Sequence, residues 1–340
     1  MQQNKINYLD LASAYKKDKK KYLKIFDEVM SSGQYMPQKN VETLENKICK
    51  FLKVKYCATL NSGTDALLMC LYSLKLKKRD EIITTPNTWY ATIASILHVG
   101  LVPKFVDIKF DQNFNEDLIE KNITKKTKAI LAVHLNGKMT DVIKIKKICK
   151  KYKLKFIEDA AQAFGASFEN VSPGQLSDIA CFSTNPTKTL FSFRDGGYVV
   201  SNNKKLIDKI KLLRNHGIIK NNREECDEFG FNSRMDELQA KILVEKLKEI
   251  KKKIKLRNLN AKIYNKYLDK KYFYLDAKKK NLLNSYQFFL VLCEKRDELF
   301  RYLNDKGVMV TKYFHIPIYK QKAYKKIFPK VIKLKNADYL

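Results

Sequence analysis

A rhythm of short apolar segments and amphipathic segments runs from residue 81 to residue 159, and it constrains the fold more than any other feature. Parallel strands need crossover connections, so this alternation predicts a mostly parallel sheet with helices on both faces, an α/β fold. The strands are expected at 81–84, 104–107, 128–134 and 154–159, and the helices at 90–98, 116–122 and 142–152. Further strands are expected at 56–60, 181–182 and 198–200.

The flanking segments predict a second, smaller domain. A Lys-rich helix is expected within residues 1–30, and an amphipathic helix at 41–51. After the sheet, the pattern predicts a helical stretch beginning at 201–215, one long helix at 237–259, a strand at 286–292 and a helix at 296–305. We therefore expect a large domain at 1–245 and a smaller α+β domain at 246–340.

Composition places the chain among globular proteins. Hydrophobic residues make up 45% of its 340 residues, and no apolar run approaches the roughly 20 residues that span a bilayer. The N-terminus lacks a basic and apolar leader, so a cytoplasmic location is expected. The 7 cysteines are odd in number and contain no CxxC pair, which argues against a zinc site and a disulfide framework. They are expected to be reduced core residues, and no metal is expected.

The net charge of +31 raises the alternative of nucleic-acid binding. However, the basic residues are mostly lysines in short runs on predicted helix faces, whereas readers of base edges favour arginine. No zinc-finger spacing or RNA-binding aromatic motif is present. The charge is typical of an AT-rich genome, and neither a nucleic acid nor a membrane is expected as a partner.

The segment CFSTNPTKTLFSFRDGGYVV at 181–200 contains the first candidate catalytic residue, Lys188. This lysine lies between two predicted strands and among apolar neighbours. Apolar surroundings disfavour a charged amine, which lowers its pKa and makes it a usable nucleophile for a Schiff base. A surface lysine in a hairpin is the alternative.

Two further segments supply partners for such a lysine. Asp159 ends the predicted strand at 154–159, and strand ends are where open α/β sheets bind ligands. Pyridoxal phosphate needs an acid opposite its pyridine nitrogen as well as a lysine. Gly63 and Thr64 begin a predicted helix, whose free N–H groups suit a phosphate, although an ordinary helix cap is the alternative.

Six segments together resemble the DegT/DnrJ/EryC1/StrS family of sugar aminotransferases. The resemblance covers nearly the whole chain, and the motifs follow the family's order and spacing. It implies pyridoxal-phosphate fold type I, with a mostly parallel seven-stranded sheet. The segments are NSGTDAL (61–67), PNTWYATIASILHVGLVPKFVDI (86–108), EDAAQAFGA (158–166), FSTNPTKTL (182–190), DGGYVVSN (195–202) and FNSRMDELQA (231–240).

The resemblance also implies roles for individual residues. Lys188 would form the Schiff base and shuttle a proton, Asp159 would pair with the pyridine nitrogen, and Gln162 would lie beside the ring hydroxyl. Trp89, the only tryptophan, would cover the ring, with a core tryptophan as the alternative. The residues expected at the phosphate are Gly63, Thr64 and Ser183, together with Asn232 from the second subunit of a homodimer.

The function implied is transfer of an amino group from L-glutamate to a nucleotide-linked keto sugar, for surface glycans such as lipopolysaccharide O-antigen. The helix in PNTWYATIASI is closer to members that aminate C3 of a dTDP-3-oxo-6-deoxyhexose than to those acting at C4. A 4-oxo sugar linked to UDP, GDP or dTDP remains the alternative acceptor. Two further hypotheses are a non-transaminating sugar enzyme, such as a dehydratase, and a regulator that has lost catalysis.

Substrate contacts are the least determined part of the expected site. Phe164 stands where relatives often have His or Ser, which is expected to alter substrate-side contacts, and Tyr319 stands where they commonly have His. The chain ends roughly 20 to 30 residues before such proteins usually do, so the small domain is expected to lack its last helix and strand. Candidate substrate contacts, each also plausible as a structural or surface group, are Arg214, Lys220, Arg234 and Tyr319.

Overall fold

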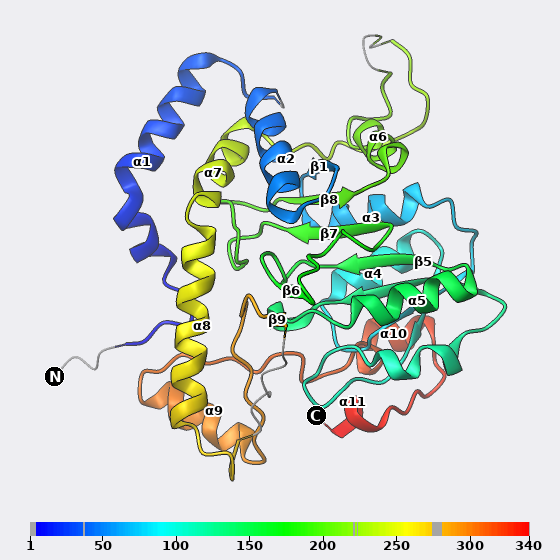
Figure 1. Cartoon of the computed structure of the whole chain (residues 1–340), viewed down its shortest axis with the longest axis vertical. Helices are drawn as coiled ribbons and strands as arrows, with labels where there is room; N and C mark the ends of the chain where they lie inside the picture. The colour runs from blue at the N-terminus through cyan, green and yellow to red at the C-terminus, as the bar shows by residue number, and fades with distance from the viewer. Residues whose placement is uncertain (1–4, 37, 220–221, 223, 274–280, 340) are drawn as a thin grey trace.

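The computed structural model describes residues 5–36, 38–219, 222, 224–273 and 281–339. Its centre is a seven-stranded sheet with the order β1-β8-β7-β5-β4-β2-β3 (Figure 1). The strands β7, β5, β4, β2 and β3 are parallel, whereas β8 runs antiparallel to both of its neighbours. The α/β fold and the mostly parallel seven-stranded sheet expected from the sequence are confirmed.

The strands of this sheet are short, and most of their residues are buried. They are β1 (Tyr56–Leu60), β2 (Glu81–Thr84), β3 (Val102–Phe105), β4 (Thr127–Val133), β5 (Lys155–Asp159), β7 (Ile179–Ser183) and β8 (Gly197–Ser201). A separate antiparallel pair joins β6 (Ser167–Phe168) to β9 (Leu282–Leu283).

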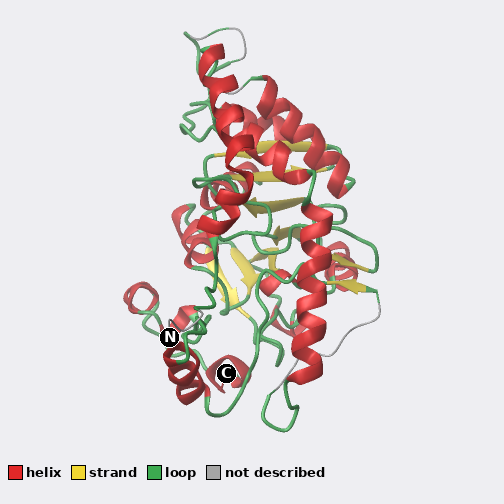
Figure 2. Cartoon of the chain, turned by 90° about the vertical axis from the view of Figure 1, so that its left-hand side faces the viewer, coloured by secondary structure: helices red, strands yellow, loops and turns green. Residues whose placement is uncertain are grey.

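Helices cover both faces of the sheet and continue beyond it (Figures 1 and 2). They are α1 (Leu11–Ser32), α2 (Lys39–Leu52), α3 (Gly63–Ser73), α4 (Tyr90–His98), α5 (Val142–Tyr152), α6 (Lys204–Leu213), α7 (Glu237–Leu247), α8 (Ile250–Tyr267), α9 (Arg296–Asp305), α10 (Lys322–Ile327) and α11 (Lys335–Tyr339). Single 3-10 turns lie at Glu116–Leu118, Glu120–Asn122, Leu135–Gly137 and Ile318–Lys320.

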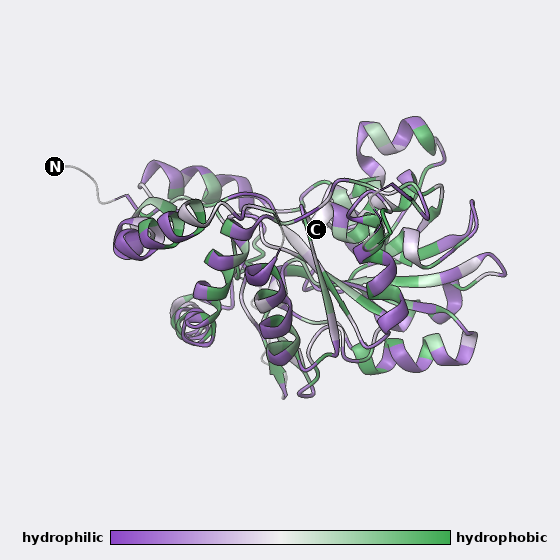
Figure 3. Cartoon of the chain, turned by 90° about the horizontal axis from the view of Figure 1, so that it is seen from above, coloured by the Kyte–Doolittle hydropathy of each residue, from purple (hydrophilic) through white to green (hydrophobic). Residues whose placement is uncertain are grey.

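Two hydrophobic clusters hold these layers together. One packs α2, α5, α7 and the start of α8 against the sheet, and the other packs α3, α4 and α6. Successive side chains of a strand point to opposite faces, so neighbours such as Phe156 and Ile157 belong to different clusters. Figure 3 shows apolar colour concentrated in the sheet, while the helices carry both apolar and polar stripes.

The C-terminal part differs from its expected pattern in two places. The helix expected at 237–259 is two helices, because the chain bends between Leu247 and Ile250 so that Ile250 and Ile254 reach the core. The strand expected at 286–292 is wrong, because Tyr286 has a φ of 45°, outside the extended region.

The helix expected at 116–122 is also wrong, since this stretch forms two 3-10 turns. The side chain of Glu116 is buried there and accepts a hydrogen bond from the Asp141 amide at 2.5 Å. That tertiary contact holds the first turn in place, and it is not visible in a helical hydrophobic pattern.

The last described residues return to the large sheet. Ile318, Tyr319 and Tyr324 join the cluster of α3 and α4, and Asp107 accepts hydrogen bonds from the amides of Asn336 and Ala337 at 2.9 and 3.0 Å. The division into 1–245 and 246–340 stays a prediction.

Candidate active site

Three loops converge at one edge of the central sheet: those that follow β1 and β5, and the β7–β8 connection. Asp159 ends β5 and pairs in register with Cys181 of β7, which ends at Ser183. On the other side, Leu60 ends β1 opposite Gly197, the first residue of β8. The carboxyl ends of β1, β5 and β7 therefore lie at the same edge, where open α/β sheets bind their ligands.

Asp159 presents a buried carboxylate at this edge. The residue is 5% exposed, and its Oδ2 accepts a hydrogen bond from the Thr92 hydroxyl at 2.7 Å. Its Oδ1 accepts one from the Ala161 amide at 3.1 Å. Among the described residues no cation forms an ion pair with this carboxyl group, so the structure leaves it available to a cationic group of a ligand.

Lys188 lies in the β7–β8 connection and within electrostatic reach of Asp159. Burial lowers the pKa of its amine, and the nearby Asp159 carboxylate opposes that effect without cancelling it. A tight turn fixes the lysine, because the Lys188 amide donates to the Asn185 carbonyl at 2.9 Å. This environment favours the neutral, nucleophilic amine, as expected, and disfavours a freely exposed hairpin lysine.

The N-terminus of α3 forms a small cradle beside these groups. Ser62 caps the helix by accepting from the Asp65 amide at 3.0 Å. A Cβ added to Gly63 would lie 2.6 Å from the Ser183 Cβ, so only glycine lets that serine approach the helix end. A Cβ on Gly197 would meet the Ser62 carbonyl at 2.4 Å. Free N–H groups, the hydroxyl of Ser183 and the exposed Thr64 suit a phosphate.

Gln162 is buried and oriented by two neighbours. Its Oε1 accepts a hydrogen bond from the Asn136 amide at 2.7 Å, and its side chain also bonds to Tyr313. Burial raises the pKa of Tyr313 to about 12, with the Gln162 bond opposing it, so this phenol is neutral at physiological pH. Sequence reasoning did not identify Tyr313 or Asn136.

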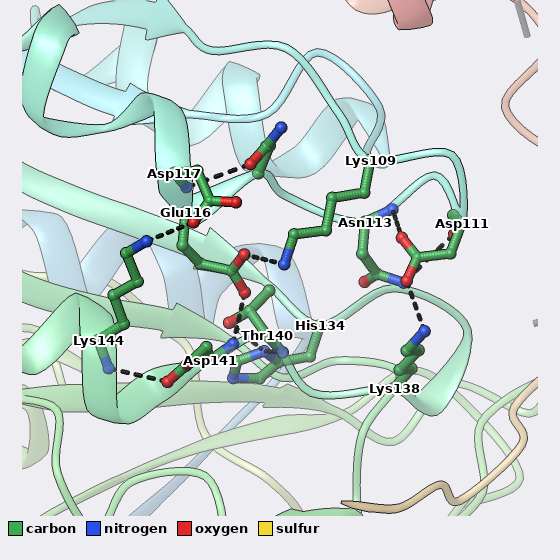
Figure 4. A network of polar contacts seen from close by, with 11 residues as sticks. Lys109, Asp111, Asn113, Glu116, Asp117, His134, Lys138, Thr140, Asp141 and Lys144 are labelled. Atoms are coloured by element: carbon green, nitrogen blue, oxygen red, sulfur yellow. Dashed lines mark hydrogen bonds and ion pairs between the residues drawn. The ribbon is translucent and has the colours of Figure 1, made fainter. Parts of the chain in front are cut away.

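A polar network supports the turn that presents Asn136 (Figure 4). Lys138 pairs with Asp111 at 2.5 Å, and Asn113 accepts from the Leu135 amide at 3.0 Å. Lys109 pairs with the buried Glu116 in the same network. Nearly all these side chains are withdrawn from solvent, so the contacts fix the turn behind Gln162.

His134 ties this turn to β5. Its Nε2 lies 2.7 Å from Glu158 Oε2, and both side chains are buried. Glu158 also accepts from the Gly174 amide at 2.8 Å. Both carboxylate oxygens of Glu158, the residue before Asp159, therefore form hydrogen bonds within the fold. These bonds hold the end of β5 rigid.

Trp89 and Asn232 are accessible in the single chain. Trp89 precedes α4 and is 56% exposed, which excludes the alternative of a core tryptophan. Asn232 accepts hydrogen bonds from the Arg234 guanidinium at 3.2 and 3.1 Å. An open hollow is lined by Met36, Asn61, Arg194, Asn232, Arg234, Met235 and Asp236. Arg194 pairs with Asp236 in this hollow at 3.5 Å, and Arg234 is the candidate substrate residue that lies in it.

The other substrate candidates make internal contacts. Arg214 Nη1 donates to Glu45 at 2.7 Å and to the Thr59 carbonyl at 2.7 Å. Tyr319 is buried, and its hydroxyl donates to Asp338 at 2.8 Å. Both therefore have the structural role that the sequence left open, and a substrate contact for either stays a prediction. Lys220 lies outside the described residues.

Phe164 corrects one expectation. Its ring stacks on Phe51 with centroids 4.8 Å apart and meets the edge of Phe182 at 6.1 Å. The side chain is buried in the cluster of α2 and α5, so a substrate-side role for Phe164 is wrong for this chain. An aromatic residue at this position fills the core behind the sheet.

Thr92 is a further residue that sequence reasoning missed. It belongs to the expected helix at 90–98, and its hydroxyl lies between Asp159 and the Thr88 hydroxyl, which is 2.7 Å away. The sequence feature that could have identified Thr92 is the run of small polar residues on the buried side of an otherwise apolar helix. Such residues are buried only where they have partners.

These groups fit pyridoxal 5'-phosphate. The cofactor requires a carboxylate for its ring nitrogen, an amine for its aldehyde and hydrogen-bond donors for its phosphate. The described residues supply the buried Asp159 carboxylate, a lysine of lowered pKa, and a helix N-terminus with glycine and hydroxyls. No cluster of three or more metal-ligating side chains occurs in the described part of the chain. None of the described helices combines the length and apolarity needed to cross a membrane.

Comparison with known proteins shows the family of this chain. The family model described as the DegT/DnrJ/EryC1/StrS aminotransferase family matches residues 16–340. A dTDP-3-amino-3,6-dideoxy-alpha-D-galactopyranose transaminase of Aneurinibacillus thermoaerophilus is 33% identical over 94% of this chain and 88% of its own. A UDP-4-amino-4,6-dideoxy-N-acetyl-beta-L-altrosamine transaminase of Campylobacter jejuni is 33% identical over 92% and 84%.

A solved structure supports the fold as well as the family. DesV of S. venezuelae superimposes with a TM-score of 0.94 at 29% identity, covering 98% of this chain and 90% of that one. Both the resemblance and the fold type expected from the sequence are therefore confirmed. The chain belongs to the DegT/DnrJ/EryC1/StrS aminotransferase family, whose cofactor is pyridoxal 5'-phosphate.

Proposed function

We propose that this chain transfers the amino group of L-glutamate to a dTDP-3-oxo-6-deoxyhexose and yields a dTDP-3-amino-3,6-dideoxyhexose for a surface glycan. The observation that carries the proposal is that the buried Asp159 carboxylate lies within electrostatic reach of a lysine whose pKa is lowered by burial. The relative from Aneurinibacillus thermoaerophilus, named for a 3-amino product, supports the choice of acceptor.

Asp159 and Lys188 divide the chemistry. When bound, pyridoxal phosphate supplies the electron withdrawal that makes proton removal from the donor's α-carbon possible. The Asp159 carboxylate would lie opposite the ring nitrogen, and the Thr92 hydroxyl holds that carboxylate in one orientation. Lys188 first holds the cofactor, and its freed Nζ then accepts and returns the proton, for which a lowered pKa is favourable.

The remaining residues bind and orient. Gly63, Thr64 and Ser183 would hold the phosphate at the close approach of Gly63 to Ser183, Gln162 would bind beside the ring hydroxyl, and the exposed Trp89 would cover the ring. A partly open site with an exposed tryptophan is what a shared active site needs, so we place Asn232 of a second subunit at the phosphate. The active form is then a homodimer.

The cellular setting is part of the same proposal. All seven cysteines are free thiols, with Cys226 exposed rather than in the core as expected. Free thiols support a reducing compartment, and we place the reaction in the cytoplasm.

The first experiment is the visible spectrum of the purified protein with pyridoxal phosphate, before and after L-glutamate. We expect a visible absorbance band that glutamate removes, and we expect Lys188→Ala to lose that response. Lys251→Ala, an exposed lysine of α8, is the matched control and should behave as the wild type. A colourless wild-type protein, or a wild-type response in Lys188→Ala, would refute the assignment.

The acceptor is tested by the reverse colour change. Protein that has reacted with glutamate is mixed with dTDP-3-oxo, dTDP-4-oxo, UDP-4-oxo or GDP-4-oxo 6-deoxyhexoses, and the return of the band is followed. We expect the 3-oxo sugar to restore it fastest. Faster restoration by a 4-oxo sugar would move the reaction to C4 while leaving transamination in place.

A further inference from the structure

A short segment of the C-terminal part, residues 284–287, contacts the loop that carries Lys188. We refer to it as the bridging segment. Gln287, its last residue, is 6% exposed and bonds to both sequence neighbours of Lys188. Its Nε2 donates to the Thr187 carbonyl, and its Oε1 accepts from the Thr189 hydroxyl at 3.0 Å.

The direction of these hydrogen bonds is determined by a third group. Arg257 of α8 donates from Nη1 to the Thr189 hydroxyl at 2.9 Å. A guanidinium can only donate, so the Thr189 hydroxyl must give its own hydrogen to Gln287. The amide oxygen of Gln287 therefore faces Thr189, which leaves the amide nitrogen for Thr187. Each group in this series of hydrogen bonds has a matching partner.

The bridging segment also reaches the Gln162 side of the site. The Ser285 amide donates to the Gly137 carbonyl at 2.9 Å, and the Ser285 hydroxyl lies 3.4 Å from the Gln162 carbonyl. Gly137 has a φ of 86°, and a Cβ there would lie 2.7 Å from the Gln287 amide. The turn and the segment therefore fit closely only with glycine at this position.

We propose that Gln287 is a positioning residue for Lys188. Through Gln287, the bridging segment fixes the position of the Lys188 amine relative to the residues that hold the cofactor ring. The inference rests on the proposed function of Lys188. Gln287 acts through the flanks of the lysine: it holds the Thr187 carbonyl on one side and the Thr189 side chain on the other. A loop held at one flank can still rotate, whereas one held at both flanks cannot.

The first test measures the loop without any cofactor. Gln287→Met keeps the length of the side chain and removes both hydrogen bonds. In the apo protein we expect hydrogen exchange of the Lys188 and Ser192 amides, which report on the turn, to become about tenfold faster, because one or two net hydrogen bonds are lost. Gln175→Met is the control, since Gln175 donates to the Leu52 carbonyl at 2.7 Å, away from this loop.

The second test measures the reaction with glutamate. Misplacement of a reacting group lowers the rate of the chemical step, so we expect kcat of Gln287→Met to fall about 10- to 100-fold while KM for glutamate changes by less than about threefold. Thr189→Val, which removes the hydroxyl, should show part of this loss, and Thr189→Ser, which retains it, should restore wild-type values. These variants keep the test available if Gln287→Met does not fold.

The outcomes separate the two proposals. Wild-type exchange at Lys188 and Ser192 together with a wild-type kcat in Gln287→Met would overturn the positioning role. An equal loss in the Gln175→Met control would assign the effect to general destabilisation and overturn it too. A wild-type protein that does not respond to glutamate would instead overturn the proposed function, whatever the exchange data show.

Discussion

Replacing Lys246 by methionine is expected to stabilise the protein. The Lys246 side chain is 5% exposed, and its amine has no hydrogen-bond partner among the described residues. It lies over the rings of Phe191 and Phe193, at 3.5 and 4.2 Å from their centroids, and 5.5 Å from that of Tyr22. A buried ammonium without a carboxylate partner costs free energy that methionine avoids.

Two opposing effects determine the magnitude. Burial, assisted by the nearby charge of Lys253, lowers the pKa of Lys246 to about 7. Keeping this amine charged at neutral pH would then cost at most about 5 kcal/mol. Attraction to the two nearest aromatic faces offsets about 1 to 2 kcal/mol each. The expected gain from Lys246→Met at pH 7 is therefore on the order of 2 kcal/mol.

The stability gain from Lys246→Met depends on pH. Between about pH 7 and 10.5 the unfolded chain binds a proton at Lys246 that the folded chain does not bind, so the free energy of unfolding of the wild type rises with pH. Below about pH 7 both states are protonated and the cost is constant. Lys246→Met lacks this slope, so its advantage should shrink from pH 7 to pH 10.

Urea unfolding of both proteins at several pH values tests the argument. Lys251→Met, an exposed position of α8, is the control and should stay within about 0.5 kcal/mol of the wild type. If Lys246→Met is destabilised at pH 7, the aromatic attraction outweighs the burial cost and the reasoning is refuted. An advantage that does not change with pH would refute the part that rests on titration.

Two further substitutions test the site and the core. Asp159→Asn should lower the rate of the half-reaction with glutamate by at least about 100-fold, because a neutral amide does not stabilise a protonated ring, while the protein still binds pyridoxal phosphate. Steady-state kinetics measure the rate, and absorbance titration measures cofactor binding. A wild-type rate would contradict the role of Asp159. Glu45→Gln should cost about 3 kcal/mol in urea unfolding, because it leaves Arg214 without its buried partner. Burial alone would raise the pKa of Glu45, but Arg214 and Lys211 lower it overall, so this contribution should be present above about pH 4.3 and be lost at lower pH. A pH-independent difference between wild type and Glu45→Gln would contradict that account.

The parts of the fold that the sequence predicted have a strong local period. The strand β2 and the helices α4, α5 and α9 match the expected boundaries residue for residue. The helices α4 and α5 have apolar residues at the spacing of one buried face, whereas β2 is buried on both faces and α9 has no buried residue. The bend between α7 and α8 has no such signal, because the Lys/Glu pattern continues through it.

The candidate site was predictable to the extent that its chemistry lies in contiguous motifs. Asp159 ends a strand, Gly63 begins a helix and Lys188 lies in the connection between two strands, and the structure brings these segments to one edge. Phe164 could not be placed in this way. Its ring lies in the hydrophobic core behind the sheet and packs against the rings of Phe51 and Phe182. A side chain near a catalytic motif in sequence can point to either face of the sheet.

The residues that sequence reasoning missed share one physical property: they act through contacts between distant segments. Thr92 reaches Asp159 from α4, and Gln287 reaches Thr187 and Thr189 from the C-terminal part. No local pattern marks such residues, since a buried polar side chain is recognised by its partners. The motifs supply the reacting groups, whereas these distant contacts hold the groups in place. Exchange at the Lys188 amide in Gln287→Met and in Gln175→Met therefore measures a part of the site that its motifs do not contain.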